Sequence, residues 1–245
     1  MRKLIACLLT LLAAPSAAMS MEVICPPLIG EGMTDFAKAY TQQTGIPVTV
    51  KAAVMGRIMA DIKAGPADVV ILPAGLMEGL AKENGVQPGS RQKVGRMEIA
   101  LAVRPGVPHP DISTLAKFAA ALKSAGTVAY TQPGPPRNSM EAGMIDQILH
   151  RPEFSGVHAL TVTTGSGISA LAKGDADMAL QATSAIISSK NVELVGPLPS
   201  ELGAHIDLEA AMSRDTANAQ AAQDFIRYIT RPETEKDWKR FGLDR

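Results

Sequence analysis

The sequence predicts an α/β protein built from two similar lobes that face each other across a cleft. Short apolar runs rich in β-branched residues alternate with helical segments of about ten residues, which is typical of βαβ units and parallel sheets. A segment around Asp68 also recurs around Asp177, 109 residues further along the chain. A unit that recurs at about half the chain length suggests two lobes, and facing strand-end loops would make a clamshell.

The first half of the chain shows the strand–helix alternation clearly. We expect strands at Met21–Cys25, Val48–Ala52, Ala67–Leu72 and Arg96–Val103. We expect helices at Thr34–Thr44, Met55–Ala64 and Leu76–Asn84. A glycine follows each of these helices, and glycine commonly ends a helix because it adopts the left-handed conformation without strain.

The alternation then restarts in the second half. We expect helices at Ile112–Ser124, Met140–His150 and Ser166–Lys173, and strands at Thr127–Thr131, Ala159–Thr163 and Ala176–Gln181. Asp68 and Asp177 each stand at the beginning of a strand, whereas ligands of α/β sheets gather beyond the carboxyl ends. We therefore expect both aspartates to accept hydrogen bonds from backbone amides rather than to act as acids or bases.

The N-terminus has the pattern of a secretory signal peptide. Arg2 and Lys3 precede an apolar stretch, Leu4–Ala14, and small residues follow it. The stretch is shorter than the ~20 residues of a membrane-spanning helix. We assign residues 1–20 to the signal peptide, with cleavage between Ala18 and Ser20, and expect a periplasmic protein. Cys25 then remains as a single thiol, which we expect to be buried and unpaired.

Composition and motifs argue against several functional classes. The 24 basic and 24 acidic residues balance, so no nucleic-acid or anionic membrane surface is expected. No histidine pair has metal-ligand spacing, and no nucleophile elbow or phosphate-binding loop occurs. The stretch Gly165–Ala170 fits G-x-G-x-x-A, but the next strand ends without the acidic residue of a dinucleotide site. We expect no enzymatic activity, no cofactor and no bound metal.

Three segments resemble a known family. Phe36–Val48 resembles the first helix and second strand of extracytoplasmic solute-binding proteins. Ala64–Ile71 is similar to the G-x-P-A-D-hydrophobic signature of the molybdate-binding branch of ABC importers, and Arg231–Leu243 is similar to its closing helix. The resemblance covers essentially the whole mature chain.

The resemblance implies a two-lobed type II periplasmic-binding fold, with a mainly parallel sheet flanked by helices in each lobe. It implies that a small anion is held in the interlobe cleft and delivered to an ABC importer permease in the inner membrane. The chain departs from the molybdate branch at three positions. Leu28 replaces a serine, only Gly56 fits the pattern at the second helix, and Gln181 stands near an expected tyrosine.

The predicted ligand therefore stays open between molybdate or tungstate and a small carboxylate. Arg57 or Arg137 would either reach the cleft and bind a carboxylate or lie on the surface. Asn138 and Glu141 fit a capping box at the start of a helix. The predicted ligand-binding residues are Pro27, Leu28, Val54, Met55, Gly56, Pro73, Gln132, Asn138, Ser139, Thr164, Gly165 and Gln181.

The expected domain boundaries follow from the strand pattern. We assign residues 21–100 and 196–245 to lobe 1 and residues 101–195 to lobe 2, with hinges near Leu101–Arg104 and Leu194–Pro197. We expect a monomer that closes around its ligand by hinge motion. An exported hydrolase or lyase would require a catalytic constellation, and a sensory receptor would require an attached output domain; neither feature is found in the sequence.

Overall fold

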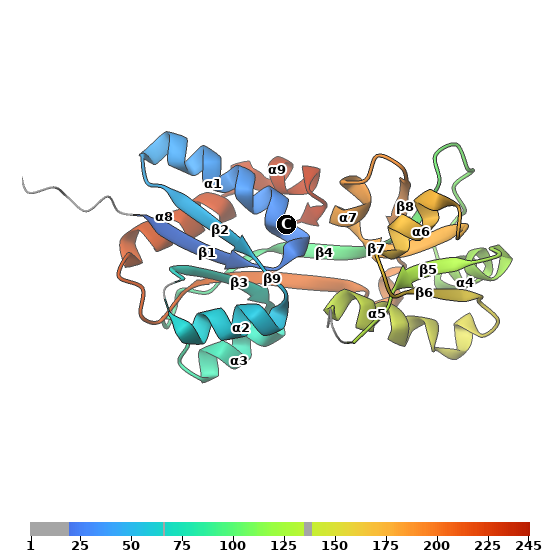
Figure 1. Cartoon of the computed structure of the whole chain (residues 1–245), viewed down its shortest axis with the longest axis horizontal. Helices are drawn as coiled ribbons and strands as arrows, with labels where there is room; N and C mark the ends of the chain where they lie inside the picture. The colour runs from blue at the N-terminus through green and yellow to red at the C-terminus, as the bar shows by residue number, and fades with distance from the viewer. Residues whose placement is uncertain (1–19, 66, 135–138) are drawn as a thin grey trace, which may run out of the picture.

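The computed structural model describes residues 20–65, 67–134 and 139–245. It has two lobes connected by two long antiparallel strands, β4 (Gln92–Val103) and β9 (His205–Met212), which run side by side from one lobe into the other (Figure 1). None of the helices within the described ranges has the length and apolar character that crossing a bilayer demands. The expected signal peptide lies outside the described residues.

Lobe 1 contains a parallel unit of three strands. The strands β1 (Met21–Cys25), β2 (Val48–Ala52) and β3 (Val69–Pro73) lie in the order β2-β1-β3, and β9 pairs antiparallel with β3. One face is covered by α1 (Gly30–Thr44), α8 (Ala219–Thr230) and α9 (Glu235–Arg240). The other is covered by α2 (Met55–Ala64) and α3 (Ala74–Lys82).

Lobe 2 repeats this arrangement. The strands β5 (Val128–Thr131), β6 (Ala159–Val162) and β7 (Met178–Ala182) are parallel in the order β7-β5-β6, and β4 pairs antiparallel with β7 and with β8 (Glu193–Pro197). The helices α4 (Leu115–Ser124) and α5 (Met140–Leu149) pack on one face. The helices α6 (Gly167–Lys173) and α7 (Thr183–Ile187) pack on the other. A short strand, β10 (Leu243–Asp244), pairs with β4 near the C-terminus.

The two recurring aspartates have matching roles in the two lobes. Asp68 Oδ2 accepts a hydrogen bond of 2.8 Å from the backbone N–H of Glu22, just before the part of β1 that pairs with β3. Asp177 Oδ2 accepts one of 2.9 Å from the N–H of Thr127, just before β5. Each aspartate therefore ties the start of one parallel strand to its neighbour. This confirms that they bind backbone amides.

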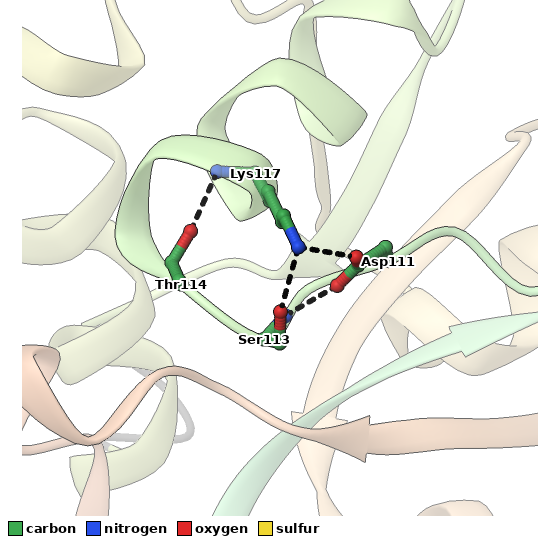
Figure 2. Close-up of polar contacts among 4 residues, drawn as sticks. All are labelled: Asp111, Ser113, Thr114 and Lys117. Atoms are coloured by element: carbon green, nitrogen blue, oxygen red, sulfur yellow. Dashed lines mark hydrogen bonds and ion pairs between the residues drawn. The ribbon is translucent and has the colours of Figure 1, made fainter.

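Four helices begin at other positions than the sequence predicts, and two of these shifts are small: α3 begins at Ala74 instead of Leu76, and α6 at Gly167 instead of Ser166. Helix α1 begins at Gly30 instead of Thr34, because a 3₁₀ turn at Pro27–Ile29 leads directly into it. Helix α4 begins at Leu115 instead of Ile112, because residues 111–114 form a cap (Figure 2).

In this cap the backbone and side chain of Lys117 are both bound. Thr114 Oγ1 accepts the N–H of Lys117 at 3.3 Å, and Asp111 Oδ2 lies 2.7 Å from Lys117 Nζ. The other Asp111 oxygen accepts the N–H of Ser113 at 2.9 Å, so the chain turns before the helix can start.

Cys25 is completely buried at the end of β1, as the sequence predicts. Its burial raises the pKa of the thiol to about 12, because the surrounding apolar side chains disfavour the thiolate.

The predicted lobe boundaries fall inside β4 and β8, and the position of a hinge remains a prediction.

Candidate functional site

A cavity of about 380 Å³ lies between the lobes, at the carboxyl ends of the parallel strands. This is the position at which α/β sheets bind their ligands. Its lining comes from the strand-to-helix junctions of both lobes and from β9. The residues are Pro26, Pro27, Leu28, Val54, Pro73 and Ile206 from lobe 1, and Thr131, Ser139, Met140, Glu141, Ser166 and Gln181 from lobe 2.

The lobe 1 wall of the cavity is apolar. All six of its lining residues have hydrocarbon side chains, and three of them are prolines, which lack a backbone N–H. Val54 keeps 48% of its surface exposed, although it is a large apolar residue. The lobe 1 wall therefore favours contact with carbon atoms of a ligand.

The lobe 2 wall is polar except for Met140. Thr131 Oγ1 donates a 3.3 Å hydrogen bond to Gln181 Oε1, and both side chains are buried at the ends of neighbouring strands. Ser139 caps α5 by accepting the N–H of Ala142 at 3.3 Å. Ser166 caps α6 by accepting the N–H of Ser169 at 3.3 Å.

Two helices thus begin at the polar wall. The first backbone N–H groups of an α-helix have no partner within the helix, and the helix dipole makes this end partly positive. The starts of α5 and α6 are therefore suited to a carboxylate or another anion, as expected for such junctions.

Among the described residues that line the cavity, Glu141 alone has an ionisable side chain. It lies on the first turn of α5, and its Oε1 accepts a hydrogen bond from the backbone N–H of Ala182, at the start of α7. The expected capping box of Asn138 and Glu141 is therefore wrong for Glu141. Ser139 caps the helix instead, and Asn138 lies outside the described residues.

Burial raises the pKa of Glu141 to about 7. The protein removes water from the carboxylate, which raises the pKa, and the Ala182 N–H lowers it by a smaller amount. At neutral pH the protonated and ionised forms are both populated.

The structure brings six of the predicted site residues to the cavity: Pro27, Leu28, Val54, Pro73, Ser139 and Gln181. Met55 and Gly56 form the start of α2, directly after Val54. Gln132 and Thr164 are exposed near the wall without lining it, and Gly165 precedes the cap residue of α6. Arg57 pairs with Asp61 at 2.7 Å on the exposed face of α2, and Arg137 lies outside the described residues.

The sequence analysis left six lining residues out of the predicted site: Pro26, Thr131, Met140, Glu141, Ser166 and Ile206. Thr131 stands at a strand end, a signal that could have identified it. Ile206 belongs to β9, a strand that was not predicted.

The lobes also make direct contact beside the cavity. Ser188 Oγ, after α7, donates a 3.0 Å hydrogen bond to Glu31 Oε2 of α1. Gly242 has φ +79°, and a Cβ at this position would lie 2.7 Å from the backbone nitrogen of Ser184. Across residues 20–65, 67–134 and 139–245, no group of three or more His, Cys, Asp or Glu side chains is placed to hold a metal ion.

Known proteins match this chain along nearly its whole length. It is 26% identical over 244 residues to an aconitate isomerase of Pseudomonas sp., covering 96% of this chain and 91% of that protein. Its structure resembles the substrate-binding domain of a putative molybdenum ABC transporter from Clostridium difficile, with a TM-score of 0.76, 14% identity, and coverage of 93% and 99%. PEB3 of Campylobacter jejuni with bound L-phospholactate has a TM-score of 0.67 at 17% identity, with coverage of 92% and 99%.

A family model of bacterial extracellular solute-binding proteins matches residues 21–244. This match confirms the family expected from the sequence, and the structural neighbours share the two-lobed α/β fold. The chain belongs to the family of bacterial extracellular solute-binding proteins.

Proposed function

We propose that this protein captures a small organic acid with several carboxylates in the periplasm and delivers it to the permease of an ABC importer. Residues 1–20 serve as the signal peptide, and the mature chain works as a monomer. Two lobes of the predicted extent close around the ligand by hinge motion.

The two-sided cavity is the observation that supports this ligand class best. An organic acid has a carbon skeleton for the apolar wall of lobe 1 and carboxylates for the polar wall of lobe 2. The cavity volume of about 380 Å³ falls in the ~300–1,000 Å³ range of organic-ligand pockets. A tetrahedral oxyanion is polar on every side and would leave the apolar wall without a partner.

The residues that distinguish this chain from the molybdate branch support the same choice. Leu28 lines the cavity at the position where the branch is expected to provide a serine hydroxyl. Each lost hydrogen bond to a charged group removes ~1.5–3 kcal/mol of binding. Molybdate and tungstate are therefore the alternative ligands, bound by backbone N–H groups of the helix starts alone.

A second candidate function is isomerisation of an unsaturated tricarboxylic acid. The expectation of no enzymatic activity agrees with the binding proteins among the relatives, but one relative is an aconitate isomerase. The specific observation that favours this candidate is Glu141, an acid–base group in the wall of the cavity. In both candidate functions the site holds a small polycarboxylate.

Thermal unfolding with a ligand panel tests the proposal. The protein is first unfolded and refolded to remove bound ligand, and then heated with trans-aconitate, cis-aconitate, citrate, succinate, molybdate, tungstate, sulfate or phosphate. A ligand at 100 times its dissociation constant adds ~2.7 kcal/mol of stability. We expect a polycarboxylate to raise the melting temperature and the four inorganic anions to leave it unchanged.

A pair of threonine variants locates the binding. Thr131→Val removes a hydroxyl from the cavity wall, and Thr161→Val changes an exposed position on the neighbouring strand β6. We expect Thr131→Val to weaken binding about tenfold, which equals ~1.4 kcal/mol, and Thr161→Val to bind normally. A shift with molybdate and tungstate but with none of the organic acids would assign the protein to oxyanion uptake instead.

A further inference from the structure

We infer that Glu141 is a catalytic acid–base that moves a proton between two carbon atoms of an unsaturated polycarboxylic acid bound in the interlobe cavity. The inference rests on the second candidate function above and assigns its chemistry to one side chain. An ionised carboxylate in the wall of the site repels an anionic ligand, so a receptor that only binds and releases an anion gains no affinity from it.

The position of Glu141 suits proton transfer. The first turn of α5 places it beside Ser139 and Met140, and the cavity wall includes all three residues. Its Oε1 is held by the N–H of Ala182, which fixes the side chain across 41 residues of sequence. The other oxygen, Oε2, is then the atom that exchanges the proton.

The proton affinity of Glu141 also matches this role. A general base works best when its pKa lies near the working pH, because both the accepting and the donating form are then available. Burial brings the pKa of Glu141 to about 7, whereas an ordinary glutamate, with a pKa of about 4, is a much weaker base toward a carbon-bound proton. Among the described residues, the causes of this shift are burial and the Ala182 N–H.

The reaction balances without a cofactor. Glu141 removes a proton from the CH₂ group between a carboxylate and the double bond of the ligand. The C–H electron pair forms a new double bond to the neighbouring carbon. The electrons of the original double bond move to its far carbon, so the double bond shifts by one position. Glu141, whose carboxyl proton exchanges with the solvent, then gives a proton to the carbon at the far end of the former double bond, so that deuterium enters this carbon in D₂O. Nothing is oxidised, reduced or hydrolysed, and the geometry about the new double bond can differ from the old one.

The polar wall stabilises the charge that develops during this step. The negative charge spreads from the reacting carbons onto the adjacent carboxylate oxygens. Ser139 brings the start of α5 to the cavity, and Gln181, whose amide oxygen is held by the Thr131 hydroxyl, adds a side-chain amide. Preorganised donors of this kind are commonly the largest contribution to such catalysis.

Proton NMR in D₂O tests the inference directly. Purified protein is incubated with trans-aconitate or with cis-aconitate, and the formation of the other isomer and the uptake of deuterium at the CH₂ group are followed. The Glu141→Gln variant keeps an oxygen for the Ala182 N–H, so we expect it to fold and to bind the acid. Glu83→Gln, at the exposed end of α3, is the matched control.

We expect isomerisation by the wild-type protein and by Glu83→Gln, at a rate that rises with pH with a midpoint near 7. We expect Glu141→Gln to lose at least 100-fold in rate while thermal unfolding still detects the bound acid. An unchanged rate in Glu141→Gln would overturn the inference. Stabilisation of the wild type by aconitate without isomerisation or deuterium uptake would overturn it and leave the receptor proposal standing. No stabilisation by any organic acid would refute the proposed function itself.

Discussion

The two recurring aspartates give a stability prediction with an internal control. Asp68 is 5% exposed, and it accepts hydrogen bonds from the Glu22 N–H at 2.8 Å, from Thr216 Oγ1 at 2.5 Å and from Asn218 Nδ2 at 3.2 Å. The side chain of Asp177 is 50% exposed, and it accepts the Thr127 N–H at 2.9 Å. Its other close partner is Arg104 at 3.7 Å.

The difference in burial sets the expected magnitudes. Hydrogen bonds to a charged group contribute ~1.5–3 kcal/mol each, but Thr216 and Asn218 can turn partly toward water after the aspartate is removed. We therefore expect Asp68→Ala to lower the free energy of unfolding by ~3 kcal/mol. Asp177→Ala loses one amide bond and a solvent-screened ion pair, and we expect a loss of ~1 kcal/mol.

Urea unfolding measures both variants. Far-UV circular dichroism follows the whole chain, and the fluorescence of Trp238, the single tryptophan, follows lobe 1, where it is completely buried. The midpoint should fall and the slope should stay constant. An equal loss of unfolding free energy in Asp177→Ala and Asp68→Ala would show that burial does not determine how much each aspartate stabilises the protein.

Further predictions concern the cavity, the core and the contact between the lobes. Because the pKa of Glu141 is raised in the folded state, its contribution to stability is full below pH ~4 and is lost as the pH rises through 7. This loss should reach ~3 kcal/mol, and pH-dependent urea unfolding should show a flatter profile for Glu141→Gln. Cys25 should react with a thiol reagent only after unfolding, and rapid labelling of the native protein would contradict its burial. Gly242→Ala should lower the melting temperature because it has positive φ and its Cβ would meet Ser184; an unchanged value would refute this close approach. Ser166→Ala should lower the free energy of unfolding by ~1 kcal/mol, because α6 loses its cap, and the urea midpoint should fall. A midpoint equal to that of the wild type would contradict the role of this cap.

Local patterns were sufficient for much of the fold. The glycine after each early helix and the apolar β-branched runs located β1, β2 and α2 with the observed bounds. The side-chain cap of Asp111 and Thr114 makes α4 start later than predicted, because a cap determines a helix start more sharply than hydrophobic periodicity does. β9 alternates polar and apolar residues from His205 to Ala210, so its signal was present in the sequence. Its antiparallel partners β3 and β4 are distant in sequence, and no local pattern identifies them.

The site was less accessible to sequence reasoning, for a physical reason. The apolar wall could be anticipated, since Pro27, Leu28, Val54 and Pro73 follow predicted strands. The role of Glu141 could not be anticipated, because its spacing from Asn138 also fits a helix cap. Its actual partner, the Ala182 N–H, comes from a different strand-to-helix junction. Tertiary packing decides which of these two contacts forms, and it also raises the proton affinity of the carboxyl.

Isothermal titration calorimetry of the refolded protein tests the central claim, the capture of an organic polycarboxylate in the two-sided cavity, most directly. We predict saturable heat with one site per chain for trans-aconitate or citrate, about tenfold weaker binding in Thr131→Val, and no heat with molybdate or tungstate. Saturable binding of molybdate or tungstate, without binding of any organic acid, would contradict the claim.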